Sequence, residues 1–86
     1  MPKYLLIHEN DDFFTEEKLK ELSKKEAPEE FEWKKTYCNF ENNKFFCLWE
    51  APSPEAIEQL FKKVNVPPCD AIYSVQTFNP KKSKLE

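Results

Sequence analysis

The chain has 86 residues, of which 40% are hydrophobic and 34% are charged, and its formal net charge is −3 at pH 7. This composition is typical of one small globular domain and excludes a disordered chain. All thirteen basic residues are Lys and there is no Gly, so a Gly-rich phosphate loop is excluded and no nucleic-acid interface is indicated.

The sequence also lacks the usual signs of export or membrane insertion. No apolar run approaches the roughly 20 residues of a transmembrane helix, and "MPKYLLIHEN" lacks the long apolar core of a signal peptide. The three cysteines are odd in number and none forms a CxxC pair. We therefore expect a cytoplasmic protein with reduced thiols and without a membrane or nucleic-acid partner.

The first half of the chain predicts a strand, a helix and a second strand. Residues 3–8 read as a short, mostly apolar strand. Thr15 is a candidate N-cap for a helix that runs to the lysines just before Pro28. Residues 31–40 are rich in aromatic and β-branched side chains, which favours a strand, and the Asn42–Asn43 pair predicts a hairpin turn.

The second half predicts a strand, a helix and a final strand. Residues 44–49, "KFFCLW", form a strand that is apolar on both faces. The following helix has Ser53 as N-cap and Pro54 at its first position. Residues 71–78, "AIYSVQTF", complete the set as a fourth strand.

The order of these elements predicts an α+β fold of the ferredoxin-like βαββαβ type. We expect residues 1–80 to form one domain, with a four-stranded antiparallel sheet and two helices on one face, and residues 81–86 to form a flexible basic tail. The two-sided strand leaves the other sheet face apolar, which predicts a homodimer that closes a dimeric α/β barrel. A lid from the termini or an unrelated partner is the alternative cover.

The hairpin register assigns the side chains to the two faces. With Asn42 and Asn43 as the turn, Phe40 pairs with Phe45 and Cys38 with Cys47, on the face toward the helices. The opposite face then carries the candidate ligand-binding residues, including a predicted Lys–Glu pair between positions 35 and 50. They are Trp33, Lys35, Tyr37, Phe46, Leu48 and Glu50. A longer turn would slide the register, and swapped faces remain the alternative.

A second candidate site lies where the first and fourth strands meet. His8 ends the first strand, and Cys69 and Asp70 precede the fourth, which should run antiparallel beside it. An imidazole, a thiol and a carboxylate are ligands for a divalent metal such as nickel, zinc or copper. The spacing is not diagnostic, and an acidic loop such as residues 9–12 is usually just solvated.

Several segments together resemble one family. They are "MPKYLLIH", "WKKTY" at 33–37, "KFFCLWEAP" at 44–52 with the following "SPEAI", and "DAIYSV" at 70–75. The chain resembles the small nickel-binding-protein-like family, a domain of unknown function. The resemblance implies a dimeric ferredoxin-like fold, with nickel or another small ligand at the sheet or dimer interface. Lys34 and Lys35 stand where metal-binding members carry a further histidine, and His8 is the only histidine of this chain.

Three functions are compatible with these observations. A homodimeric binding module for a metal or small ligand is favoured, because no nucleophile and base have a recognisable spacing and no catalytic residue is assigned. An enzyme of the dimeric α/β-barrel type, such as an oxygenase or isomerase, would use His8 as proton carrier, the Lys35–Glu50 pair and Tyr37 as donor. A structural domain, whose aromatic face only joins subunits, is the third reading.

Overall fold

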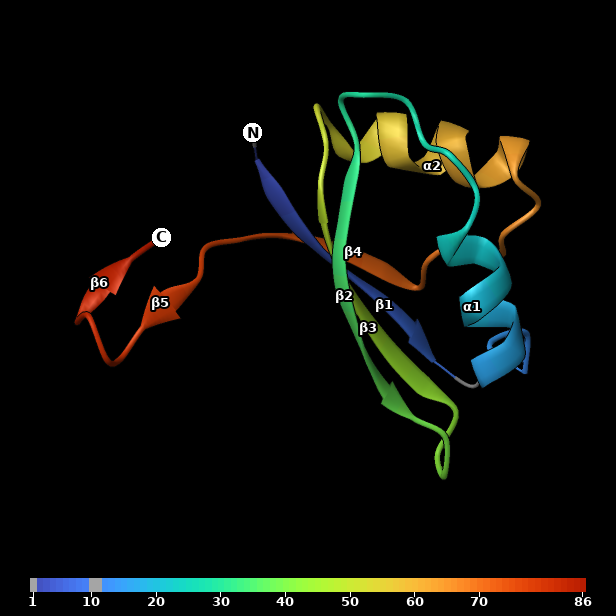
Figure 1. Cartoon of the computed structure of the whole chain (residues 1–86), viewed down its shortest axis with the longest axis horizontal. Helices are drawn as coiled ribbons and strands as arrows, with labels where there is room; N and C mark the ends of the chain where they lie inside the picture. Colours follow the sequence, from blue (N-terminus) through green and yellow to red (C-terminus); the bar gives the residue numbers. More distant parts are fainter. Residues whose placement is uncertain (1, 10–11) are drawn as a thin grey trace.

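A four-stranded antiparallel sheet forms the centre of the computed structural model, which describes residues 2–9 and 12–86 (Figure 1). Its strand order is β2-β3-β1-β4, so β1 and β3 are central and β2 and β4 are the edges, as predicted. The elements are β1 Lys3–Glu9, α1 Glu16–Ser23, β2 Glu32–Asn39, β3 Lys44–Glu50, α2 Pro54–Lys63, β4 Ala71–Val75, β5 Phe78–Asn79 and β6 Lys84–Leu85.

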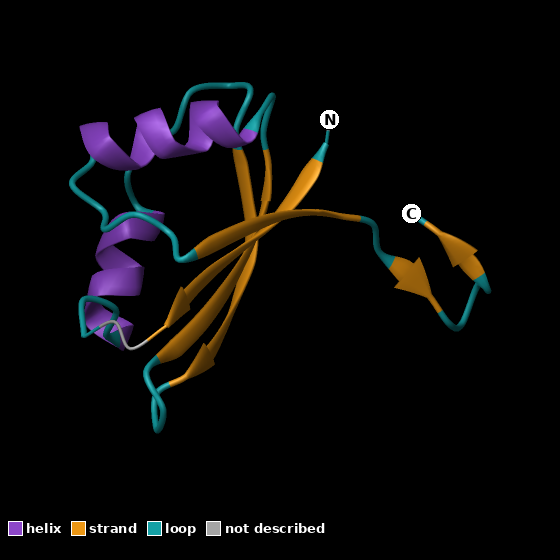
Figure 2. Ribbon diagram, turned by 180° about the vertical axis from the view of Figure 1, so that it is seen from behind, coloured by secondary structure: helices purple, strands orange, loops and turns teal. Residues whose placement is uncertain are grey.

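Both helices begin at the predicted caps. The Thr15 hydroxyl oxygen accepts a hydrogen bond from the Lys18 backbone N–H at 3.1 Å, and Ser53 accepts one from Ala56 at the same distance. Helix α1 ends at Ser23, sooner than predicted, because the Lys24 N–H closes the last turn. Figure 2 shows both helices on one side of the sheet.

The core lies between the sheet and α2. Phe45, Cys47 and Trp49 of β3 are buried on this side, where Ile57 and Phe61 of α2 are also buried. Their burial confirms the predicted face of the third strand, since alternate residues of a strand point the same way. Phe45 has no exposed surface and is among the largest fully buried side chains.

The β2–β3 hairpin has a longer turn than predicted. Residues 40–43 form the turn, and Asn43 adopts a positive φ of 53°, which Asn tolerates better than most residues. Cys38 therefore lies opposite Phe45 and Thr36 opposite Cys47, so the predicted pairs of Phe40 with Phe45 and Cys38 with Cys47 were wrong. The observed register differs from the predicted one by two residues. This shift leaves each side chain on its predicted face of the sheet, because side chains alternate between the faces with a period of two.

The C-terminal segment departs from the predicted fourth strand. Strand β4 ends at Val75, and β5 pairs with β6 in a separate antiparallel hairpin. Two residues of the segment that we expected to be a flexible tail, Lys84 and Leu85, form β6. This hairpin stands on the side of the sheet opposite the helices (Figures 1 and 2).

The helices are too short or too polar for the membrane interior. Within residues 2–9 and 12–86, no helix has both the length and the apolar character needed to span a bilayer.

We predict that Phe45→Ala lowers the free energy of unfolding by about 3–5 kcal/mol, because it leaves a cavity in the core. Phe40→Ala is the comparison, since Phe40 is 50% exposed in the hairpin turn and loses mainly its edge-on ring contact with Phe45, and it should cost about 1 kcal/mol. Urea denaturation at fixed protein concentration measures both. Equal losses would contradict the assignment of Phe45 to the core.

Candidate functional site

The sheet face away from the helices is an apolar surface, which we call the open face. Leu5 of β1 lies opposite Leu48 of β3, and Ile7 lies opposite Phe46. These four side chains are half-buried. Tyr37 on one edge strand and Tyr73 on the other are 58% and 56% exposed. Exposed aromatic rings beside an aliphatic centre are typical of a surface that meets a partner.

Five of the six predicted ligand-binding residues lie on or at the rim of this open face. The sheet register places them there by alternation: Lys35, Tyr37, Phe46, Leu48 and Glu50. The sixth residue, Trp33, does not. The register of β2 shifts between Trp33 and Lys35 by a β-bulge, which turns Trp33 to the helix side. Its ring there stacks on Trp49 at 5.9 Å between centroids, with the ring planes 2° apart.

The same irregularity changes the predicted ion pair. Lys34, not Lys35, reaches Glu50, with 2.8 Å between Lys34 Nζ and Glu50 Oε2, and it also lies 2.8 Å from Glu32. The hydrogen bond from Lys34 lowers the pKa of Glu50, and the two carboxylates raise the pKa of Lys34. The Lys35 ammonium instead lies 5.9 Å from the centroid of the Tyr37 ring.

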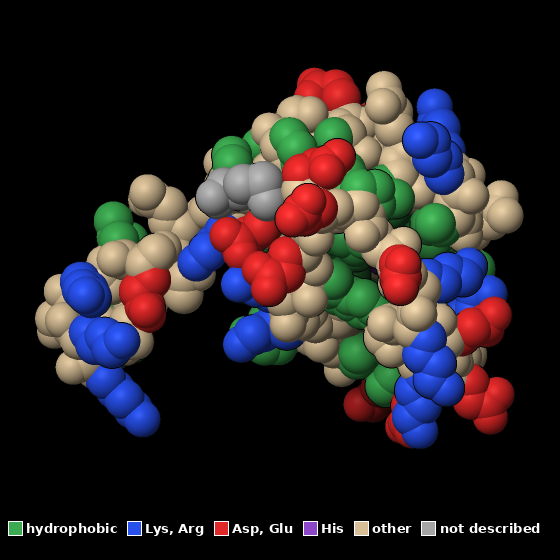
Figure 3. All heavy atoms as spheres, turned by 45° about the horizontal axis from the view of Figure 1, so that its top comes forward, with side chains coloured by type: hydrophobic (Ala, Val, Ile, Leu, Met, Phe, Trp, Pro, Cys, Tyr) green, Lys and Arg blue, Asp and Glu red, His purple; other side chains and the backbone are tan. Residues whose placement is uncertain are grey.

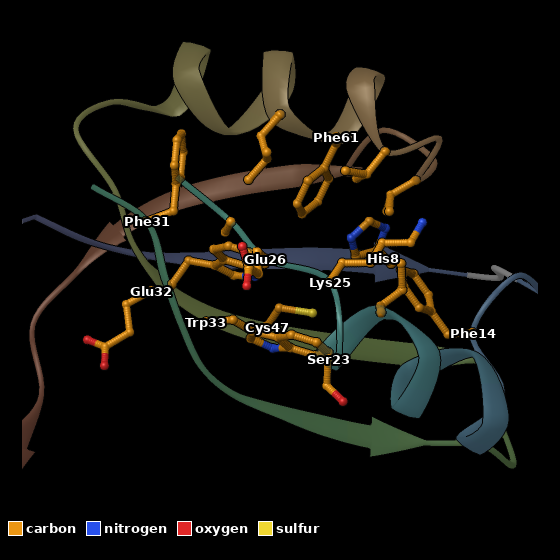
Figure 4. A pocket seen from close by; sticks show the side chains of 16 residues that line it. His8, Phe14, Ser23, Lys25, Glu26, Phe31, Glu32, Trp33, Cys47 and Phe61 are labelled. Carbon is orange, nitrogen blue, oxygen red and sulfur yellow. The ribbon is translucent and has the colours of Figure 1, made fainter. Parts of the chain in front are cut away.

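A cavity of about 370 Å³ lies on the other side of the sheet, between the sheet and the helices (Figure 4). Its walls are mainly apolar, and four residues with polar side chains, Ser23, Lys25, Glu26 and Glu32, also line it. The aromatic lining residues are Phe14, Phe31, Trp33, Trp49 and Phe61. Pockets of this size with few polar groups are typical of small-molecule sites. Sequence reasoning missed the cavity, because it depends on the bulge and on the loop after α1.

The two tryptophans of the cavity differ in their hydrogen bonding. Trp33 Nε1 donates to the Thr36 hydroxyl oxygen at 2.7 Å, and that hydroxyl lies 3.2 Å from Cys47 Sγ. The Trp49 Nε1–H is buried and has no acceptor among the described residues. A buried donor without an acceptor costs about 1–3 kcal/mol. This nitrogen has almost no accessible surface, so it is enclosed by the protein and does not face the open cavity.

The predicted metal ligands His8 and Cys69 do meet. Cys69 Sγ lies 3.6 Å from His8 Nε2, and His8 is fully buried among aromatic rings, 4.7 Å from Phe14 and 6.2 Å from Phe61 between ring centroids. Burial is the main cause that raises the pKa of Cys69 to about 12. The thiol is therefore protonated at neutral pH, which is the opposite of an activated Cys–His nucleophile.

The third predicted ligand, Asp70, is turned to the backbone of β1. Its N–H donates to the Ile7 carbonyl at 2.8 Å, and its carboxylate accepts from the Glu9 N–H at 2.6 Å. Across residues 2–9 and 12–86, no group of three or more His, Cys, Asp and Glu side chains could hold a metal ion. A square-planar nickel ion takes four ligands, so the described part of one subunit does not make a complete nickel site. Residues 10 and 11 of the acidic loop lie outside the described residues.

The candidate residues for an enzyme lie on opposite sides of the sheet. His8 is buried on the helix side, whereas Lys35 and Tyr37 belong to the open face. One substrate cannot contact both sets, because the sheet separates them. His8, Lys35 and Tyr37 of one subunit therefore do not form the predicted catalytic set.

Comparison with known proteins agrees with the resemblance carried by the sequence motifs. No curated protein and no solved structure matches the chain. Residues 4–75 match the family described as nickel responsive protein SCO4226-like. The match includes the sheet and both helices and ends before the C-terminal hairpin. The chain therefore belongs to the SCO4226-like family of nickel responsive proteins.

Proposed function

We propose that the chain is a homodimeric binding domain with a ferredoxin-like fold, in which the open faces of two copies pack together and each subunit holds a small ligand. The order β2-β3-β1-β4 with both helices on one face supports the fold. The three free cysteines support a cytoplasmic location.

The apolar open face supports the dimer. Leu5, Ile7, Phe46 and Leu48 form a continuous patch across the two central strands. Two such faces related by a twofold axis would bury each other, because a twofold interface joins the same patch on both copies. Lys3 and Glu50 are opposite one another at the end of the patch, which gives the interface a charged rim.

We predict that Leu48→Lys converts the dimer to a monomer, raising its dissociation constant at least about a hundredfold, since an unpaired ammonium would lie in the interface. Sedimentation equilibrium at micromolar concentration measures this. Phe40→Lys is the control, because Phe40 is a comparably large, half-exposed apolar residue outside the open face, and should leave the dimer intact. A monomeric wild type would refute the dimer.

The aromatic cavity is the observation that carries the ligand proposal. Its stacked Trp33 and Trp49 rings and the Phe61 ring, 5.7 Å from that of Trp49 and nearly perpendicular to it, favour a flat aromatic molecule. We therefore propose that the cavity holds a small aromatic compound. This site lies on the helix side of the sheet and not at the predicted ligand position on the open face or dimer interface.

We predict that 2-acetylnaphthalene, a flat aromatic probe, quenches the tryptophan fluorescence of the folded protein saturably, because Trp33 and Trp49 line the cavity. Ala27→Phe should weaken binding at least tenfold, because Ala27 lines the cavity. Glu29→Phe is the matched control from the same exposed loop and does not line it. Unchanged affinity in Ala27→Phe would place the probe elsewhere.

Divalent metal binding is a second candidate function, favoured by the 3.6 Å approach of Cys69 and His8 and by the family description. These residues would supply two ligands, and water or a second molecule would supply the others. Because coordination requires the deprotonated thiol, and burial raises the pKa of Cys69 to about 12, metal binding would compete with that proton.

We predict that nickel affinity rises about tenfold per pH unit between pH 6.5 and 8.5, as expected when one proton is released on binding. Nickel titration followed by thiolate-to-metal absorption measures this, with zinc and copper in parallel. Cys69→Ser should abolish the signal and Cys38→Ser, which alters an exposed cysteine, should retain it. If Cys69→Ser binds nickel like the wild type, the pair is not the site.

A further inference from the structure

The C-terminal hairpin, residues 77–86, is a projecting arm. Within the arm the Glu86 N–H donates to the Thr77 carbonyl at 2.7 Å, and the Asn79 side chain donates to the Glu86 carboxylate at 2.8 Å. The Asn79 side-chain oxygen also accepts from the Lys81 and Lys82 N–H groups, at 3.0 and 3.3 Å. All of these hydrogen bonds lie within the arm, and they define its local shape.

The arm has an apolar side that the subunit leaves exposed. Phe78 and Leu85 are directly paired across the two strands, and each is 57% exposed. An isolated two-stranded hairpin is at best marginally stable in water, and it needs an apolar surface to pack against. A hydrogen bond from Lys3 Nζ to the Glu86 carbonyl at 3.4 Å joins the arm to its own sheet, but this exposed contact does not cover the two side chains.

The position and charge of the arm indicate which surface covers it. The arm stands on the open-face side of the sheet, away from the helices (Figure 1). It carries three of the thirteen lysines and one of the sixteen acidic residues of the chain, so the arm is basic and the rest is acidic. In Figure 3 the projecting arm carries mainly Lys side chains, whereas the body carries charges of both signs, including a group of acidic side chains near the arm. The acidic body of a second copy is therefore complementary in charge to the basic arm.

We propose that the arm of each subunit clasps the partner subunit, with Phe78 and Leu85 packed on the partner's body beside the interface. The proposal rests on the face-to-face dimer proposed above and adds to it a second contact, outside residues 4–75 that match the family. In a twofold dimer both arms are used equivalently, so the contact forms twice and no unpaired arm remains.

Isotope-resolved crosslinking tests where the arm lies. Uniformly ¹⁴N- and ¹⁵N-labelled full-length protein is unfolded, mixed and refolded together, and a zero-length carbodiimide reagent then joins lysines to nearby carboxylates. We expect mixed-isotope peptides that link Lys81, Lys82 or Lys84 to acidic residues of the body. If the protein is dimeric and these links are all of one isotope, the arm folds on its own subunit and the clasp is wrong.

A double substitution measures what the arm contributes. Phe78→Ser with Leu85→Ser should raise the dimer dissociation constant at least about a hundredfold, because the contact forms twice and four buried apolar side chains are lost per dimer. The double substitution should leave the urea midpoint of the monomeric Leu48→Lys background unchanged. Phe40→Ser is the control and should leave the dissociation constant unchanged. An unchanged dissociation constant in the double variant overturns the clasp while the dimer stands, whereas a monomeric wild type overturns both.

Discussion

The rest of the structure depends on a strand that is apolar on both faces. β3 buries Phe45 and Trp49 against the helices and presents Phe46 and Leu48 on the other side. Helices cover one face of a single sheet, so the second face is left half-exposed to water. This imbalance is the physical reason for proposing a partner surface. In a chain of 86 residues the small core has little stability to spare.

A single bulge in the edge strand β2 determines which of its residues lie on each side of the sheet. Without it, Trp33 would share the open face with Lys35, as strict alternation requires. With it, Trp33 stacks on Trp49 and forms a wall of the aromatic cavity, while Lys34 becomes the partner of Glu50. The cavity and the open face thus belong to opposite sides of one sheet, which separates a proposed ligand site from a proposed subunit interface.

The family description suggests nickel binding, whereas the described side chains of this chain offer few ligands for a metal. The family is described as nickel responsive, yet the described residues bring together no group of three or more His, Cys, Asp and Glu side chains that could hold a metal ion. His8 and Cys69 do meet, but burial keeps the thiol protonated. Apolar side chains make up most of the cavity lining on this side of the sheet. We therefore favour the proposal of a small aromatic ligand over the proposal of a metal.

The sequence by itself determined the element order, both helix caps and the inward face of β3, because these depend on local residue types and on a period of two along a strand. It could not determine the hairpin register, the side of the sheet that receives Trp33, or the fold-back of residues 84–85 into a hairpin. A four-residue turn and a bulge set the first two, and each is decided by how neighbouring strands pair and pack rather than by local preference. The cavity likewise exists only once the loop after α1, helix α2 and the two tryptophans have been brought together in three dimensions.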